Sequence, residues 1–120
     1  MSLFIAGELI IKETRETVWQ KLYAQYWQLK IMKKVKKTYQ ELYQLLQEVT
    51  HHIISWAKPG MKMCELDAEA RRMLGEYSQY FTHSLGHGVG IQIHESPRVS
   101  GKSSEILEPG MVITIEPGVY

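Results

Sequence analysis

The stretch HSLGHGVGIQIHESP, residues 83–97, holds three of the chain's five histidines and three of its nine glycines within fifteen positions. Glycine is a poor helix former, so this composition argues against a helix here. In an extended strand, the even spacing of His83 and His87 places both imidazoles on one face. The stretch therefore predicts strand-like backbone that carries a cluster of imidazoles, with room beside His87 for a ligand or another backbone.

A second stretch, LEPGMVITIEPGVY at residues 107–120, predicts a turn and then a strand that ends at Pro-Gly. Between the two stretches, SPRVSGKSSE at 96–105 predicts a loop. Glu116 lies inside the apolar run, and a buried carboxylate is costly unless a cation or hydrogen bonds compensate it. Imidazoles together with a carboxylate suit Mn, Co, Zn or Fe. One interpretation of the cluster is therefore a metal site.

Other interpretations of the histidines remain open. GHGVG at 86–90 could cradle a phosphate, but such a loop should open a helix, whereas the following IQIHE at 91–95 predicts a strand. HESPR does not match HExxH, the helix-borne zinc peptidase motif. The histidines could also be three ordinary sheet residues with satisfied hydrogen bonds.

The first half of the chain has helical periodicity. No glycine or proline occurs between Gly7 and Pro59, and apolar residues recur there at spacings of three and four. We expect one very long helix, or two helices broken near the lysine run at 30–37, stopped by the KPG motif around Pro59. A further helix should begin near Leu66–Ala68, with Asp67 as its N-cap. Helices first and strands last predict an α+β fold.

Charge is distributed unevenly although the formal net charge is only +1. Residues 1–38 hold eight basic and three acidic residues, a net +5, while the remainder holds six and ten, a net −4. Five of the lysines fall in KIMKKVKK at 30–37. Such a run is more often a solvated helix face than a surface for nucleic acid or an acidic partner, so nucleic-acid binding is not favoured.

Composition also bears on location. No apolar run approaches the length of a membrane span, and the N-terminus lacks a signal-peptide pattern. The single Cys64 rules out an internal disulfide, which is typical of a reducing compartment. We expect a cytoplasmic protein without a membrane segment, and we interpret Cys64 as an ordinary residue rather than a nucleophile.

The motif YFTHSLGHGVGIQIHESP at 80–97, followed by LEPGMVITIEPGVY, resembles the metallopeptidase family that includes proline dipeptidase, Xaa-Pro aminopeptidase and methionine aminopeptidase. The helical stretch from Val35 to Leu74 also resembles that family's helix pair. The sequence around the histidines is more similar to the proline-peptidase branch than to the methionine aminopeptidases. The resemblance implies a partial pita-bread fold, with a catalytic-type domain at 33–120. It leaves 1–32 as an unmatched segment that we expect to be helical.

The resemblance also implies roles for particular residues. The family binds two divalent metals, commonly Mn, Co or Zn, and hydrolyses peptides next to proline. By match to its motifs, His87 and Glu116 are expected to be metal ligands. His94 is expected to contact substrate and steady the tetrahedral intermediate, and His83 to bind substrate or shuttle a proton. No role is transferred to Glu95, which we expect to form a local hydrogen bond.

The chain departs from the family's pattern in its acidic residues. The family takes two aspartates from a strand ahead of the helices and a last glutamate from a strand beyond EPGVY, yet Asp67 is the only aspartate in this sequence. A single histidine and a single carboxylate form an incomplete shell for a divalent ion. We therefore expect a truncated or rearranged fragment of a proline peptidase, inactive by itself. The alternative is a non-catalytic relative that binds a protein or nucleic acid. Open sheet edges also predict a homo-oligomer.

Overall fold

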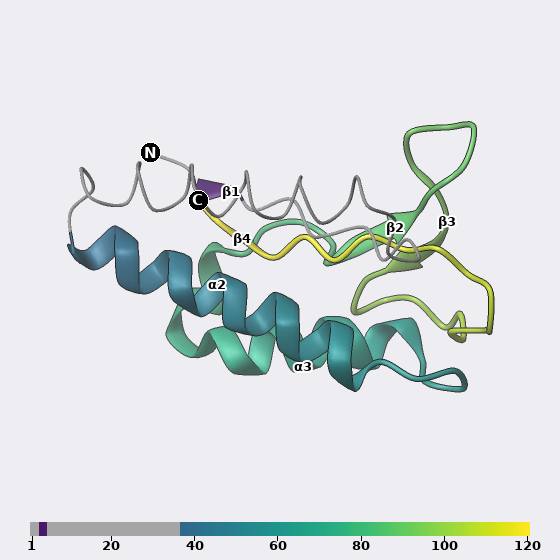
Figure 1. Ribbon diagram of the computed structural model, residues 1–120, viewed down its shortest axis with the longest axis horizontal. Helices are drawn as coiled ribbons and strands as arrows, with labels where there is room; N and C mark the ends of the chain where they lie inside the picture. The colour runs from purple at the N-terminus through teal and green to yellow at the C-terminus, as the bar shows by residue number, and fades with distance from the viewer. Residues whose placement is uncertain (1–2, 5–36) are drawn as a thin grey trace, which may run out of the picture.

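The computed structural model describes residues 3–4 and 37–120, and it arranges them in two layers (Figure 1). One layer is formed by helices α2 (Lys37–Trp56) and α3 (Met63–Leu74), with the short 3₁₀ helix η1 (Gly75–Tyr80) after them. The other layer is formed by short strands, namely β1 (Leu3–Phe4), β2 (Gly86–Gly88), β3 (Glu95–Val99) and β4 (Gly118–Val119). Helices packed on one side of antiparallel strands make an α+β fold, which confirms the predicted class.

The helix expected over the first part of the chain falls largely outside the described residues, and so does most of the lysine run. Within the described part, α2 begins at Lys37, the last lysine of that run. The ammonium group of Lys37 lies 3.8 Å from the Glu41 carboxylate, and both side chains are well exposed. An exposed pair one helical turn apart contributes only about 0.3–0.5 kcal/mol.

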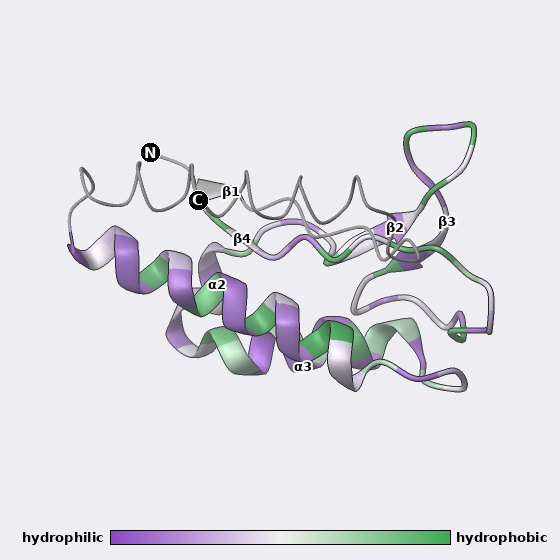
Figure 2. Ribbon diagram, in the orientation of Figure 1, coloured by the Kyte–Doolittle hydropathy of each residue, from purple (hydrophilic) through white to green (hydrophobic). Residues whose placement is uncertain are grey.

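Helix α2 follows from the spacing of its apolar residues. Leu46, Val49 and Ile53 are fully buried and share one face, while the other faces carry polar residues (Figure 2). The predicted end of the helix is confirmed, because α2 stops at Trp56 and the chain turns at Gly60, where φ is +96°. Glycine adopts that φ without the steric penalty of other residues.

The prediction that Asp67 caps the next helix is wrong. Helix α3 begins at Met63 with Lys62 at the N-cap, and the Lys62 backbone N–H donates a hydrogen bond to Glu65 at 2.7 Å. A glutamate three residues after the cap satisfies an otherwise free N–H of the first turn and interacts favourably with the helix dipole. Asp67 instead lies inside α3 with 1% of its surface exposed.

Asp67 instead anchors the segment that leads into strand β2. Its carboxylate accepts hydrogen bonds from Arg71 Nε at 2.7 Å and from the Leu85 backbone N–H at 3.1 Å. The Arg71 guanidinium also donates to the carbonyl oxygens of Phe81 at 2.7 Å and His83 at 2.8 Å. This ion pair thereby fixes the backbone on both sides of His83.

Strands β2 and β3 pair antiparallel, with His87 opposite Arg98 and a bulge between His87 and Gly88. Two predictions are wrong here. The SPRV part of the expected loop is strand β3, because Pro97 and Val99 are buried and draw the segment onto the core. The IQIHE segment, expected as a strand, is mostly a loop, and its apolar side chains find no core to cover them.

Residues 112–116 run alongside β2. Hydrogen bonds join Thr114 N–H to His87 O at 2.8 Å and Glu116 N–H to Leu85 O at 2.7 Å. The segment predicted to be a strand is therefore extended. Its backbone hydrogen bonding to β2 is incomplete, because the His87 N–H donates to the Thr114 side-chain hydroxyl at 3.1 Å instead of to a backbone carbonyl. Regular strand is confined to β4, which pairs with β1 so that Val119 faces Leu3.

The core lies between the two layers. Helix residues Leu66 and Leu74 pack with Leu85, Val99 and other apolar residues of the strand layer, and all are almost fully buried. Burial of such side chains contributes about 1.5–3 kcal/mol each, so this interface fixes the strand layer over the helices. None of the helices within residues 37–120 is long and apolar enough to cross a membrane.

A polar contact joins the two helices on their outer side. Glu69 of α3 accepts two hydrogen bonds from Arg72, each 2.7 Å long, and lies 3.0 Å from His52 Nε2 of α2. These hydrogen bonds from Arg72, with the nearby charge of that residue and of His52, lower the pKa of Glu69 from 4.5 to about 2 against the opposing effect of burial. The carboxylate in turn raises the pKa of Arg72.

Candidate active site

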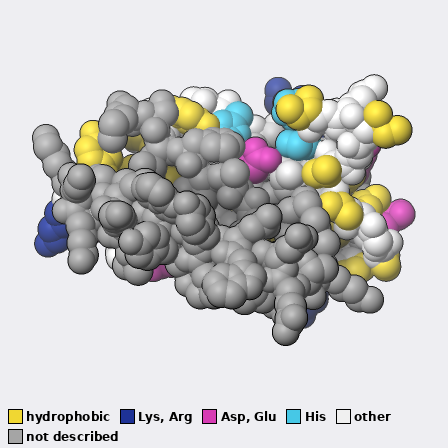
Figure 3. All heavy atoms as spheres, turned by 45° about the horizontal axis from the view of Figure 1, so that its top comes forward, with side chains coloured by type: hydrophobic (Ala, Val, Ile, Leu, Met, Phe, Trp, Pro, Cys, Tyr) yellow, Lys and Arg dark blue, Asp and Glu magenta, His cyan; other side chains and the backbone are white. Residues whose placement is uncertain are grey.

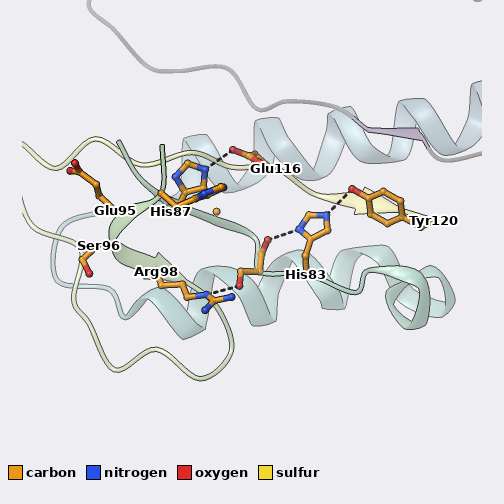
Figure 4. A pocket seen from close by; sticks show the side chains of 10 residues that line it. His83, His87, Glu95, Ser96, Arg98, Glu116 and Tyr120 are labelled. Atoms are coloured by element: carbon orange, nitrogen blue, oxygen red, sulfur yellow. Dashed lines mark hydrogen bonds and ion pairs between the residues drawn. The ribbon is translucent and has the colours of Figure 1, made fainter. Parts of the chain in front are cut away.

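An open cavity of about 750 Å³ lies on the strand layer, and its walls include all four predicted site residues, His83, His87, His94 and Glu116. These side chains come from different segments: the approach to β2, β2 itself, the loop before β3, and the extended segment before β4 (Figure 4). In the space-filling view, histidine side chains surface beside an acidic one on the face turned to the viewer (Figure 3). The fold therefore brings the predicted residues to one hollow.

His87 and Glu116 face each other across 3.3 Å, measured from Nε2 to Oε1. The other imidazole nitrogen, Nδ1, lies 2.8 Å from the Gly88 carbonyl oxygen. A carbonyl oxygen can only accept, so Nδ1 carries the hydrogen, and in the neutral ring Nε2 then presents a lone pair. A lone pair and a carboxylate oxygen at this distance repel each other unless a positive charge lies between them.

A proton on Nε2 or a metal ion could supply that charge, and the geometry is compatible with a metal. Two donors bound at about 2.1 Å to one ion with tetrahedral geometry lie about 3.4 Å apart, close to the observed separation. The contact from Nδ1 to a backbone carbonyl is also the usual second interaction of a metal-ligating histidine. Among the described residues, however, no three or more His, Cys, Asp or Glu side chains are placed so that they could hold one metal ion together. The pair thus fits two of an ion's ligands and leaves the shell incomplete.

Close strand packing explains the glycines around His87. A Cβ on Gly86 would lie 1.8 Å from the Thr114 carbonyl oxygen, and one on Gly88 would lie 2.2 Å from the Ser96 carbonyl oxygen. The absent side chains therefore let the neighbouring segments approach, and this approach sets Glu116 opposite His87. The N–H groups of His87 and Val89, which a phosphate loop would offer to an anion, donate instead to the Thr114 hydroxyl and the Val112 carbonyl oxygen, and strand β3 rather than a helix follows, which argues against that interpretation.

His94 lies in the loop between β2 and β3, with its ring 4.5 Å from that of His87 and nearly edge-on to it. The neighbouring Glu95 accepts a hydrogen bond from the Gln92 N–H at 2.7 Å, which confirms its expected local role. The apolar side chains of this loop point away, since Ile91 and Ile93 are 103% and 82% exposed. His94 is therefore held at the cavity by a short hairpin loop rather than by a regular strand.

His83 lies at the opposite end of the cavity. Its Nδ1 is 2.7 Å from the Ser84 carbonyl oxygen and its Nε2 is 3.1 Å from the Tyr120 hydroxyl. The ring also packs edge-on against Phe81 at 4.9 Å between centroids. The structure therefore places His83 in the same hollow as His87 but in a separate hydrogen-bonded group.

The sequence reasoning gave no role to several other residues of the cavity wall, among them Ser84, Arg98 and Tyr120. Arg98 Nε donates a hydrogen bond to the Ser84 hydroxyl at 2.9 Å, so its guanidinium is held at the cavity (Figure 4). The sequence did contain an indication of Arg98. Alternate residues of a strand share a face, and Arg98 lies four residues after His94, so in an extended segment both would lie on the same face. That indication was lost when the segment was interpreted as a loop.

The helix pair, the short strands and the histidine-lined cavity together define a partial pita-bread fold of the kind found in solved prolidases. The sequence profile of metallopeptidase family M24 matches residues 18–120. Since this match covers most of the chain, the chain belongs to that family. The expected family and fold are confirmed.

Individual relatives agree with this assignment. The chain is 51% identical over 82 residues to the Xaa-Pro dipeptidase of Pyrococcus furiosus and 48% identical over 82 residues to the uncharacterized peptidase YqhT of Bacillus subtilis. Each match covers 67% of this chain but only 24% and 23% of the relatives. The chain therefore spans about a quarter of the length of these relatives.

Solved structures give the same result. The prolidase from Pyrococcus furiosus superimposes with a TM-score of 0.69 at 47% identity, over 71% of this chain and 26% of that one. The Xaa-Pro dipeptidase from Bacillus anthracis gives 0.68 at 38% identity, over 71% and 24%. The match thus covers the described helix and strand layers but a minor part of each known structure.

Proposed function

We propose that this chain carries part of the metal and substrate site of an Xaa-Pro peptidase, with His87 and Glu116 as ligands of a divalent ion. The observation that carries the proposal is the 3.3 Å separation between His87 Nε2 and the carboxylate of Glu116, a distance that suits two ligands of one divalent ion. The relatives named Xaa-Pro dipeptidase supply the substrate class. When bound, a divalent ion would polarise the scissile carbonyl and lower the pKa of water.

The other cavity residues fit the handling of a short peptide. His94 stands beside His87 and can contact the same part of a ligand, and His83 can accept or carry a proton at the far end. Arg98 presents a guanidinium to the cavity, and such a group binds carboxylates through two parallel hydrogen bonds. A dipeptide ending in proline carries a carboxylate close to its scissile bond, which is the group we assign to Arg98.

The isolated chain should not turn over such a peptide. Its only aspartate, Asp67, is buried in the ion pair with Arg71, so it is not available as a ligand. A stable catalytic site normally has three protein ligands, and a pair of divalent cations needs still more negative charge. We therefore propose that further carboxylates complete the site, supplied by a longer natural chain or by a second polypeptide, with Mn, Co or Zn as the ion.

The proposal is tested by measuring zinc and manganese binding to the whole chain by calorimetry. We expect weak binding of at most one ion, reduced at least tenfold in His87→Ala and unchanged in the control His51→Ala, which removes an exposed histidine of α2. Equal affinity in both variants would contradict the assignment of His87. Two ions bound per monomer would contradict the incomplete shell.

A peptidase assay tests the catalytic part. With an Xaa-Pro dipeptide and added manganese, we expect no turnover by the isolated chain. Metal-dependent hydrolysis that disappears in His87→Ala would support the site but refute the requirement for further carboxylates. Hydrolysis that survives in His87→Ala would contradict the proposed site.

The non-catalytic alternative is favoured by one observation, namely that no three side chains of metal-ligand type are placed to hold one ion within the part of the chain that the structure describes. We expect this alternative to fail, because a pure binding module would not need the facing pair of His87 and Glu116. The expected homo-oligomer and the cytoplasmic location belong to the same proposal. Sedimentation at several concentrations tests the oligomer, and a concentration-independent monomer would contradict it.

A further inference from the structure

The two nitrogens of His83 have different partners, and these partners determine which nitrogen carries the hydrogen. Nδ1 lies 2.7 Å from the Ser84 carbonyl oxygen, which can only accept, so Nδ1 is protonated. In the neutral ring Nε2 is then an acceptor, and the Tyr120 hydroxyl at 3.1 Å donates to it. Figure 4 shows both contacts on opposite sides of the ring.

We propose that Tyr120 is a positioning residue, which holds His83 as the tautomer with hydrogen on Nδ1 by donating its hydroxyl hydrogen to the Nε2 lone pair. In this state Nε2 cannot donate a hydrogen bond. Because the Tyr120 hydroxyl hydrogen occupies the single lone pair of Nε2, the acceptor that this pair offers to the cavity is the hydroxyl oxygen of Tyr120, which suits a donor such as the amine or amide N–H of a peptide. The assignment of the ligand group rests on the proposed function, whereas the tautomer rests on the contacts alone.

Packing holds the two rings in place. The His83 ring lies edge-on between Phe81, at 4.9 Å, and Tyr120, at 5.4 Å. The backbone N–H of Tyr120 donates to the Tyr80 carbonyl at 3.2 Å, and Arg71 donates to the carbonyl of His83 at 2.8 Å. Both ends of the hydrogen bond are thus attached to fixed backbone.

Gly118 gives a second, independent indication that the contact is built into the fold. A Cβ at this position would lie 3.1 Å from His83 Nε2 and 3.1 Å from the Tyr120 hydroxyl oxygen. A side chain here would therefore require the His83 ring or the Tyr120 hydroxyl to shift by a few tenths of an ångström. Gly118 belongs to β4 and is buried.

The test is nitrogen-15 NMR of the imidazoles in the full chain, at alkaline pH where the rings are neutral. The unmodified protein should show His83 with a protonated Nδ1 and a hydrogen-bonded, unprotonated Nε2. In Tyr120→Phe the ratio of the Nε2–H to the Nδ1–H form should rise about fivefold, the change expected on losing one neutral hydrogen bond. Tyr80→Phe, which alters a half-exposed tyrosine, should leave the His83 signals unchanged.

A second variant separates positioning from a general loss of structure. Gly118→Ala keeps the Tyr120 hydroxyl but should shift the His83 signals in the same direction, with the helical circular dichroism unchanged. Unaltered His83 signals in Tyr120→Phe, or a protonated Nε2 in the unmodified protein, would overturn the proposal. Zinc calorimetry on the same variants distinguishes the proposed metal site from the proposed tautomer. A failure of metal binding at His87 would not change the tautomer of His83.

Discussion

Two acidic side chains of this molecule face basic partners in contrasting ways. Asp67 is buried and accepts hydrogen bonds from Arg71 Nε and Leu85 N–H, so every group in the contact is matched within the chain. Glu116 faces an Nε2 atom that has no hydrogen to give while the ring of His87 is neutral. The first arrangement is complete as folded and serves stability, whereas the second is matched only when a proton or a metal ion lies between the two atoms.

The sharpest way to break this comparison is to neutralise the buried acid. Asp67→Asn keeps the shape but removes the charge opposite Arg71, so we expect a loss of about 3 kcal/mol in the free energy of unfolding. Urea denaturation measures it, with the exposed Glu48→Ala as a control that should change little. A loss below about 1 kcal/mol would show that Asp67 is not the anchor of the strand approach.

The second prediction concerns the close backbone approach that sets Glu116 opposite His87. Gly86→Ala would bring a Cβ within 1.8 Å of the Thr114 carbonyl oxygen, so the segments must separate. We expect a loss of about 2 kcal/mol together with loss of zinc binding.

Gly110→Ala is the matched control for that change. Its added Cβ meets no atom within 4 Å but must adopt a φ of +88°. It should cost about 1 kcal/mol and leave zinc affinity unchanged. Equal effects of the two variants on zinc affinity would contradict the role given to the strand approach.

The third prediction is a gain in the free energy of unfolding, whereas the first is a loss. Glu116→Gln is the same acid-to-amide change, but it replaces a repelling acceptor with an N–H donor facing the lone pair of His87. Without metal, we expect the chain to gain about 1 kcal/mol of stability and, with zinc, to lose its metal-dependent stabilisation. Thermal unfolding with and without zinc measures both. Destabilisation without metal would instead identify a protonated His87 as the missing cation.

The smallest effect is expected at the outer contact of the helices. Because the pKa of Glu69 falls from 4.5 in the unfolded chain to about 2 in the folded one, its ion pair stabilises the fold fully above about pH 4.5 and is lost as the pH falls towards 2. Since Arg72 is largely exposed, the contribution should be about 0.5 kcal/mol. Glu69→Gln should remove this part of the acid dependence in urea titrations, and an unchanged profile would contradict it.

Much of the architecture was predictable because it depends on local patterns. The buried stripe of α2, its end at the KPG motif and the LEPGM turn follow from residue spacing and from glycine and proline chemistry. Long-range effects were not predictable. Asp67 resembled a cap because its hydrogen bond to the Leu85 N–H is visible only once α3 packs against the segment that leads into β2.

The site shows the same division. The motifs identified His83, His87, His94 and Glu116, and the structure gathers all four around one cavity. Arg98 and Tyr120 were missed, because their relevance depends on which face of a short strand they occupy and on contacts across 37 residues of sequence. Neither property can be deduced from composition or spacing when the strand itself is misassigned.

The loop that carries His94 has a practical consequence. Ile91 and Ile93 lie almost fully in solvent, and exposed loop tips are where proteases cut folded proteins first. Thermolysin, which cleaves before large apolar residues, should nick the chain here while β2 and β3 stay paired. A ligand seated against His94 would slow that cleavage, so the rate of nicking can report occupancy in crude extracts, without any assay of turnover.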